Sequence, residues 1–145
     1  MIGGLWRHGE AVVPVHDPFT GRLLAEVSNA SSTDAEAAIQ STVDAAAAMG
    51  ALPSHARYRA LQKIAGGLYD RREEFARLMT AEAGKPITDA KREVSRAVQT
   101  FTVAAEEAKR IPGEVIPLDW TPGTDSHLGI LRRVPIGPVL GITPF

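Results

Sequence analysis

The sequence predicts an α/β fold, in which helices cover one face of a parallel sheet. Three observations favour this class. Four helical stretches follow one another through residues 34–111, strand-like runs lie on both sides of them, and the chain closes on the apolar run Val-Leu-Gly-Ile-Thr at 139–143. Apolar runs bounded by Gly and Pro are typical of buried parallel strands. Because no later element covers this run, we expect the chain to be the front part of a larger α/β domain.

The composition is that of a soluble globular protein. Of 145 residues, 44% are hydrophobic and 23% charged, and 16 basic against 17 acidic residues give a formal net charge of -1. Without a basic stripe, nucleic acid is not an expected partner. The absence of cysteine excludes disulfides, thiolate metal sites and a Cys nucleophile from this stretch. No signal peptide is evident, and no apolar run approaches the ~20 residues of a membrane helix, so we expect a cytoplasmic protein without membrane contact.

The first thirty residues predict a β meander. Strand-like runs at 12–15 and 23–27 flank the turn sequence Asp17-Pro18-Phe19-Thr20-Gly21. Thr33 is then a candidate N-cap, with Glu36 completing a capping box. The alanine-rich stretch 34–49 predicts the first helix, ended by Gly50 and Pro53.

Three further helices follow. Ser54 is the candidate cap of the second, whose apolar stripe is Leu61, Ile64, Ala65 and Leu68. The third carries Phe75, Leu78 and Met79 and ends at Gly84, which suits a left-handed C-cap. The fourth is expected over residues 88–111, with an inward stripe formed by Val94, Ala97, Val98, Phe101, Ala105 and Ala108.

Extended chain is predicted after the fourth helix. An apolar run at 115–118 precedes a polar loop at 121–126. Two strands are then expected, at 129–135 and 139–143, separated by a Pro-Ile-Gly-Pro corner at 135–138.

Four sequence blocks, taken in order, resemble the N-terminal part of the aldehyde dehydrogenase superfamily. They are Asp17-Pro18-Phe19-Thr20-Gly21, Glu82-Ala83-Gly84-Lys85-Pro86, Ala90-Lys91-Arg92-Glu93-Val94 and the final block from Arg133 to Phe145. The last is the specific one, because in that family an Arg-x-Pro-hydrophobic-Gly segment leads into a strand that ends in Thr-Pro-Trp or Thr-Pro-Phe. The resemblance covers the whole chain.

The resemblance implies a fold and an assembly. It divides the chain into residues 1–113, the N-terminal part of a Rossmann-like cofactor-binding domain with its β meander and four helices; 114–137, an oligomerisation arm; and 138–145, the first buried strand of an incomplete cofactor-binding sheet. The arm of the family pairs between subunits. A homodimer or homotetramer is therefore expected for the whole enzyme.

The resemblance also implies an activity, the oxidation of an aldehyde substrate to a carboxylic acid with NAD or NADP. The cofactor-binding residues carried over are Ile142, Thr143, Pro144 and Phe145. In the family a Cys attacks the aldehyde, an Asn stabilises the oxyanion and a Glu activates water. None of these three is present here, since the chain contains no Cys and stops one residue before the Asn. We therefore expect no catalytic residue and no activity in this chain by itself.

Other interpretations remain open. From the residues alone, 142–145 could be a core strand without ligand contact. The four histidines lack metal-like spacing, and no metal site is expected. Glu82 and Glu93 fit a solvated helix face better than an acid–base pair. A non-catalytic binding or oligomerisation module and a CoA-acylating dehydrogenase are the alternative functions, and the aldehyde and the choice between NAD and NADP stay undetermined.

Overall fold

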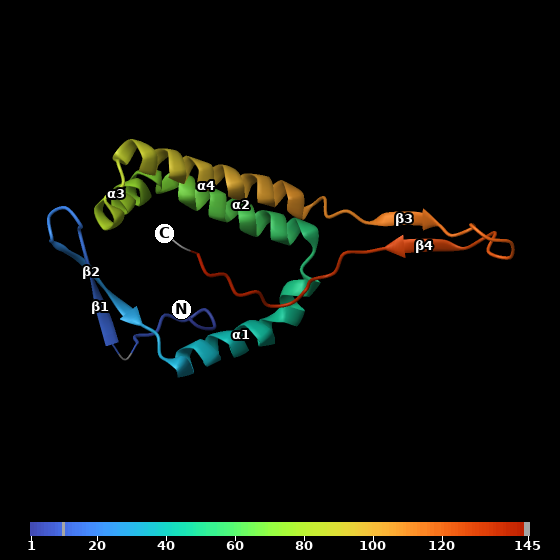
Figure 1. The fold of residues 1–145 in the computed structure, drawn as a ribbon, viewed down its shortest axis with the longest axis horizontal. Helices are drawn as coiled ribbons and strands as arrows, with labels where there is room; N and C mark the ends of the chain where they lie inside the picture. Colours follow the sequence, from blue (N-terminus) through green and yellow to red (C-terminus); the bar gives the residue numbers. More distant parts are fainter. Residues whose placement is uncertain (10, 144–145) are drawn as a thin grey trace.

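The structure is a computed structural model that describes residues 1–9 and 11–143. Its elements, in chain order, are β1 (Ala11–His16), β2 (Leu23–Asn29), α1 (Ser32–Ala51), α2 (Ser54–Asp70), α3 (Arg72–Ala83), α4 (Ile87–Ala108), β3 (Glu114–Pro117) and β4 (Leu128–Leu131). β1 pairs with β2 and β3 with β4, each pair antiparallel. Figure 1 shows α2 and α4 side by side, α1 apart from them, and the β3–β4 hairpin projecting from one end.

The β meander predicted at the N-terminus is confirmed. Val13 lies opposite Val27 in the ladder. The turn is fixed by Asp17, whose Oδ1 accepts hydrogen bonds from the backbone N–H groups of Phe19 (2.8 Å) and Thr20 (3.0 Å). Gly21 closes the turn with a φ of 71°, a left-handed conformation that glycine adopts without a steric penalty.

The first helix is confirmed, but its predicted cap is wrong. Ser31, not Thr33, is the N-cap of α1: its Oγ accepts from the N–H of Asp34 at 3.1 Å, and the Asp34 carboxylate accepts from the N–H of Ser31 at 3.1 Å. The capping box therefore uses Asp34 rather than Glu36. Asp34 stands three residues after Ser31, whose backbone is extended. This is the spacing and conformation in which the two reciprocal bonds of a capping box form.

The second cap prediction is also wrong. Pro53 occupies the N-cap position of α2 and makes no side-chain cap bond, while Ser54 is already the first helical residue. The Ser54 hydroxyl instead accepts a hydrogen bond from Arg57 at 3.3 Å. Proline fixes φ near the helical value, which starts the helix without a side-chain cap.

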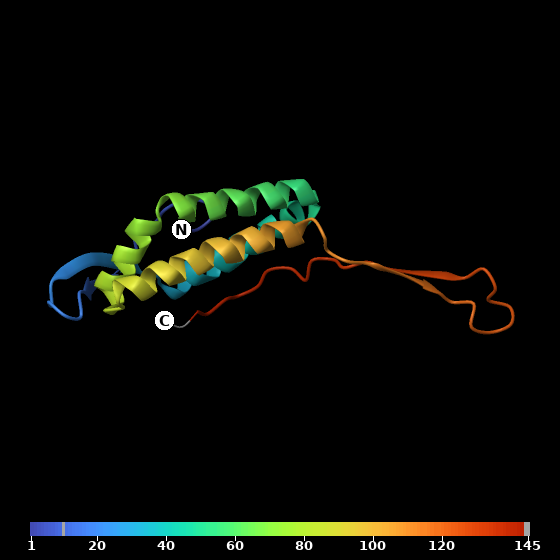
Figure 2. The ribbon, with the colours of Figure 1, turned by 90° about the horizontal axis from the view of Figure 1, so that it is seen from above.

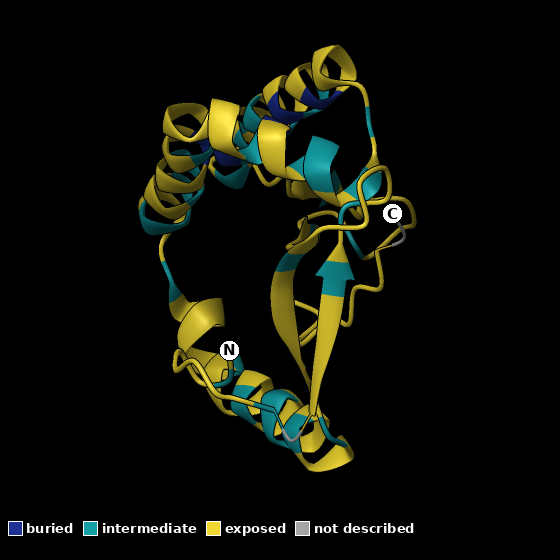
Figure 3. Ribbon diagram, turned by 90° about the vertical axis from the view of Figure 1, so that its left-hand side faces the viewer, coloured by how far each residue is buried: buried dark blue, intermediate teal, exposed yellow. Residues whose placement is uncertain are grey.

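Small side chains form the core between the helices. α2 and α4 run antiparallel, and α3 folds back against α4. The buried residues are Ala65, Ala76, Ala90, Val94 and Ala105, with Phe75 and Met79 packed against the α3–α4 cluster. Alanines allow close backbone approach but bury little apolar area. Figure 3 shows that burial is confined to this helical layer.

The inward stripe predicted for α4 is largely confirmed, whereas two other stripe positions are not. Val94 and Ala105 are buried and Phe101 is half-buried. Ile64 of α2 and Leu78 of α3 are exposed, because each lies on a helix face that no other described element covers. Among the described residues, no helix is both long and apolar enough to cross a membrane.

The two strands predicted near the C-terminus differ from the structure. The first strand is shorter than expected, because β4 ends at Leu131 and does not continue to Pro135. Leu131 pairs with Glu114, the first residue of β3, so β4 has no partner beyond this point. The second strand, predicted at 139–143, is not formed in this structure: within the described residues, 132–143 carry no strand. Strand pairing needs a neighbouring backbone, and neither two-stranded sheet reaches this segment.

The side chains of this last segment are exposed rather than buried on both faces. Val139 is 77%, Leu140 82% and Ile142 85% exposed. Figures 1 and 2 show the segment returning from the hairpin past the helices. It approaches α1 at Gly50, where an added Cβ would lie 3.6 Å from the Cγ of Pro135.

The exposed segment generates a prediction about stability. The purified 145-residue chain should bind a dye specific for apolar surface and self-associate, because each apolar side chain left in water forgoes roughly 1.5 to 3 kcal/mol of burial. Dye fluorescence and sedimentation measure both properties. A monomeric chain with a sharp two-state melt and no dye binding would contradict the prediction.

Candidate functional site

The first three sequence blocks meet in space at one corner of the molecule. The turn at 17–21 lies against the connection between α3 and α4, where a Cβ added to Gly84 would stand 3.3 Å from the Cγ of Pro18. A shallow groove between them is lined by Asp17, Phe19, Arg77, Thr80, Ala81, Gly84 and Ile87. We call residues 17–21 and 82–87 together the turn corner.

Gly84 turns the chain between α3 and α4. It is the C-cap of α3 in the predicted left-handed conformation, with a φ of 67°, and its N–H donates to the carbonyl of Thr80 at 2.9 Å. A residue with a side chain is strained there. Pro86 then provides the N-cap position of α4, so the reversal takes only a few residues.

Two ion pairs join the first part of α4 to the turn corner and to α3. Lys85 donates to the carboxylate of Glu93, near the end of the second turn of α4, and Lys91 of α4 lies 2.9 Å from Glu73 of α3. The hydrogen bond from Lys85 lowers the pKa of Glu93, with further contributions from the charges of Lys85 and Arg96. The hydrogen bond from Lys91 lowers the pKa of Glu73 in the same way.

These pairs correct one interpretation of the sequence. Glu93 is not a freely solvated helix residue, because its side chain is 38% exposed and is bonded to Lys85, whose side chain is 25% exposed. A carboxylate with a lowered pKa stays ionised near neutral pH, so Glu93 is unsuited to general acid catalysis. Its partner lies eight residues away, outside the short helical spacings that sequence inspection detects.

The predicted cofactor-binding residues lie away from these pairs, in the extended C-terminal segment. Ile142 and Thr143 are exposed and belong to no strand; Pro144 and Phe145 lie outside the described residues. A Cβ added to Gly141 would meet nothing within 4 Å. The segment thus presents an open backbone and exposed apolar side chains.

A second, larger groove lies between the helices and the start of this segment. Its walls come from α1, from the beginning of α2 and from residues 132–139. The groove reaches Val139 and does not include Ile142 or Thr143. No sequence pattern predicted this groove, because its residues come from distant parts of the chain.

Comparisons with known proteins give one consistent result. A family model described as "Aldehyde dehydrogenase family" matches residues 6–145. The 3-sulfolactaldehyde dehydrogenase of Priestia aryabhattai is 37% identical over 144 residues, which cover 99% of this chain and 30% of that protein.

Solved structures agree. The crystal structure of aldehyde dehydrogenase 21 from Physcomitrella patens, in complex with the reaction product succinate, superposes with a TM-score of 0.86 and 39% identity, covering 90% of this chain and 27% of that one. The structure of an NAD-dependent benzaldehyde dehydrogenase from Corynebacterium glutamicum superposes with a TM-score of 0.77 and 28% identity. The match covers 84% of this chain and 27% of that one. The chain therefore spans about 30% of the length of the curated relatives it matches.

The left-handed turn generates a prediction. Gly84→Ala should lower the free energy of unfolding by about 1 kcal/mol or more, because alanine is strained at this φ and its Cβ meets Pro18. The matched control is Gly66→Ala within α2, where a Cβ meets nothing within 4 Å; it should stabilise by up to about 1 kcal/mol. Urea unfolding of the protein in its full natural length, followed by far-UV circular dichroism, measures both. Equal effects of the two substitutions would refute the role given to Gly84.

The Lys85–Glu93 pair generates a second prediction, on pH. Since the folded-state pKa of Glu93 is lowered, the stabilisation is present above the unfolded-state value of about 4.3 and is lost as the pH falls through the folded-state pKa. Glu93→Gln should thus lower the midpoint of thermal unfolding at pH 7. The difference in midpoint between the variant and the parent protein should shrink toward pH 3.

The control for this experiment is Glu74→Gln, which breaks the more exposed Arg71–Glu74 pair. Solvent screening should make its effect smaller. A Glu93→Gln deficit that does not change with pH would show that the pair is not the cause.

Proposed function

Since the chain belongs to the aldehyde dehydrogenase family, we propose that it forms the helical part of the cofactor-binding domain of an enzyme that oxidises an aldehyde to a carboxylic acid with NAD or NADP. The observation that carries the proposal is the family match across nearly the whole chain, together with the superposition on solved aldehyde dehydrogenases. The α/β fold class predicted from the sequence agrees with these neighbours.

In this proposal the C-terminal segment has two tasks. Val139 and Leu140 enter a parallel sheet, and Ile142, Thr143, Pro144 and Phe145 contact the dinucleotide beyond the end of that strand. Ligands of open α/β sheets bind beyond the carboxyl ends of the strands. The exposure of Ile142 and the open space at Gly141 support this assignment. The dinucleotide, when bound, accepts the hydride of the oxidation.

The nucleophile of the reaction lies outside this chain. The family's mechanism uses a Cys thiolate, and the 145 residues contain no cysteine. The contribution of this chain is therefore structural and cofactor-related: the helices support the sheet, and the segment at 142–145 helps to position the cofactor. The alternative function, a CoA-acylating reaction, would use the same helical layer.

The β3–β4 hairpin is proposed as the oligomerisation arm, spanning 114–137. It projects from the helical layer (Figures 1 and 2) and carries exposed apolar side chains along its length, including Val115, Trp120, Leu128 and Ile130. A two-stranded ribbon of this kind has unpaired edges and is marginally stable alone. Pairing with a second subunit, in a homodimer or homotetramer, would cover it.

The proposal predicts the outcome of a binding experiment on the protein in its full natural length. Ile142→Ala should raise the Kd for NADH or NADPH about tenfold, which corresponds to about 1.4 kcal/mol of lost apolar contact. The matched control is Ile136→Ala, an exposed isoleucine of the same segment before Pro138, which should bind as the parent does. Fluorescence titration of the reduced cofactor gives both constants.

The same preparation tests the activity. The full-length protein should form NADH or NADPH from short aliphatic or aromatic aldehydes, whereas the 145-residue chain should not at any pH, because no thiol is present to attack the carbonyl. Unchanged cofactor affinity in Ile142→Ala would contradict the placement of the segment. Aldehyde oxidation by the rigorously purified 145-residue chain would contradict the proposed division of labour.

A further inference from the structure

The connection between α1 and α2 is tied together by Arg57. The C-cap of α1 is Leu52 and α2 begins at Ser54, so the two helices meet within a few residues. From the first turn of α2, one terminal nitrogen of Arg57 donates to the carbonyl of Leu52, and the other donates to the hydroxyl of Ser54 at 3.3 Å. The Nε atom of Arg57 is buried there. We call residues 50–57 the helix joint.

The bond to Leu52 supplies what the end of α1 lacks. The last carbonyl groups of a helix have no partner within the helix, and a nearby cation stabilises them. The last turn of α1 contains no basic residue, so Arg57 provides the cation from the next helix. Within the described residues, α1 packs extensively against no other helix or strand, and Figure 1 shows it apart from α2 and α4. The direction of α1 relative to α2 therefore depends on the helix joint.

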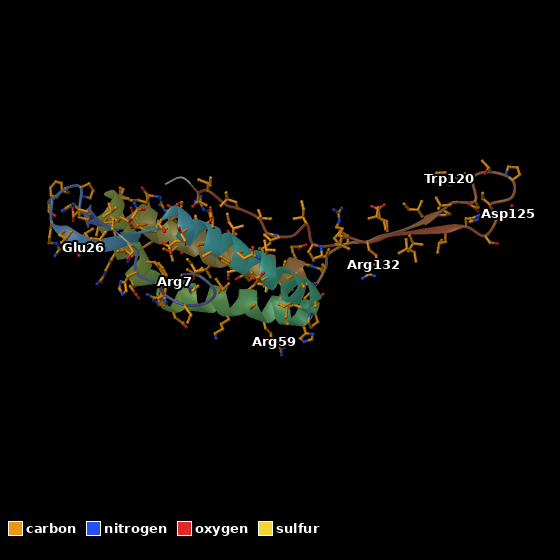
Figure 4. All side chains as sticks on the ribbon, turned by 90° about the horizontal axis from the view of Figure 1, so that it is seen from below. Arg7, Glu26, Arg59, Trp120, Asp125 and Arg132 are labelled. Atoms are coloured by element: carbon orange, nitrogen blue, oxygen red, sulfur yellow. The ribbon has the colours of Figure 1, made fainter. Side chains whose placement is uncertain are left out.

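The C-terminal segment passes the helix joint on its way to the proposed cofactor strand. A Cβ added to Gly50 would lie 3.6 Å from the Cγ of Pro135, and Arg57 and Pro135 both line the larger groove. Figure 4 labels Arg132 where the segment leaves the hairpin. Pro135 stands four residues before Val139, where the proposed strand begins. A shift at the end of α1 would therefore be passed to the start of that strand.

We propose that Arg57 is a positioning residue for the cofactor. By fixing the end of α1, it sets where the chain enters the strand at 139–143 and so how Ile142 and Thr143 meet the dinucleotide. The inference rests on the proposed function, and Arg57 acts through Pro135 rather than by touching the cofactor. The role suits arginine, because its planar guanidinium reaches two acceptors at once, whereas the ammonium group of lysine is a point charge.

Cofactor binding and turnover of the full-length protein test the proposal, at a temperature well below the thermal midpoint of each variant. Arg57→Gln should raise the Kd for NADH or NADPH at least fivefold and leave kcat at saturating cofactor within twofold, because the reacting groups lie elsewhere. Ser54→Ala and Arg57→Lys, which each keep part of the joint, should give smaller increases. The matched control is Arg59→Gln, an exposed arginine on the outer side of α2 (Figure 4), which should bind as the parent does.

Amide hydrogen exchange without cofactor separates this inference from the proposed function. The amides of Val139 and Leu140 should exchange faster in full-length Arg57→Gln than in the parent, while those of α3 and α4 keep their rates. If the parent binds neither dinucleotide, the proposed function fails and the exchange rates alone decide whether Arg57 positions the segment. A lower thermal midpoint with unchanged Kd and unchanged exchange at these two amides would overturn the inference. Where Arg57→Gln does not fold, Arg57→Lys gives the same comparison.

Discussion

The left-handed turn at Gly84 is the constraint on which the helical layer depends. It reverses the chain so that α3 packs against the start of α4, which brings Ala76 against Ala90 and Val94. Only a residue without a Cβ makes this turn without strain and also leaves room for Pro18. The β1–β2 turn can then rest on the corner, and Lys85 can reach Glu93.

The helical layer has a small apolar core. Four of its five buried residues are alanines, and burial of so little apolar area stabilises weakly against the entropy of ordering the chain. α1 has no buried residue, and the segment after β4 lies exposed beside it. Both observations fit the proposal that a sheet completes the apolar face of this helical layer.

Local sequence signals predicted the elements that depend on local interactions. The helices follow from apolar periodicity and alanine content, the 17–21 turn from its Asp and Gly, and the end of α3 from Gly84. The cap of α1 was misplaced by two residues, because Ser31 and Thr33 are both competent caps and the choice depends on the reciprocal bond with Asp34.

Features that depend on distant partners could not be predicted in the same way. The run at 139–143 has the composition of a strand, but a strand forms only when a neighbouring backbone pairs with it. The ion pair of Lys85 with Glu93 joins residues eight apart across the turn at Gly84, and the larger groove joins α1 and α2 to residues 132–139. The assignment of Ile142 to Phe145 to the cofactor rests on the resemblance to a family and stays a prediction.

We propose that the exposed segment at 139–143 becomes a sheet strand beside the cofactor in the full-length protein. Amide hydrogen exchange of the full-length protein and of the 145-residue chain tests it most directly. We expect the backbone amides of Val139, Leu140 and Ile142 to exchange slowly only in the full-length protein. The amide of Thr143 should exchange still more slowly when NAD or NADP is bound. Rapid exchange of these amides in the full-length protein, with and without the dinucleotide, would contradict it.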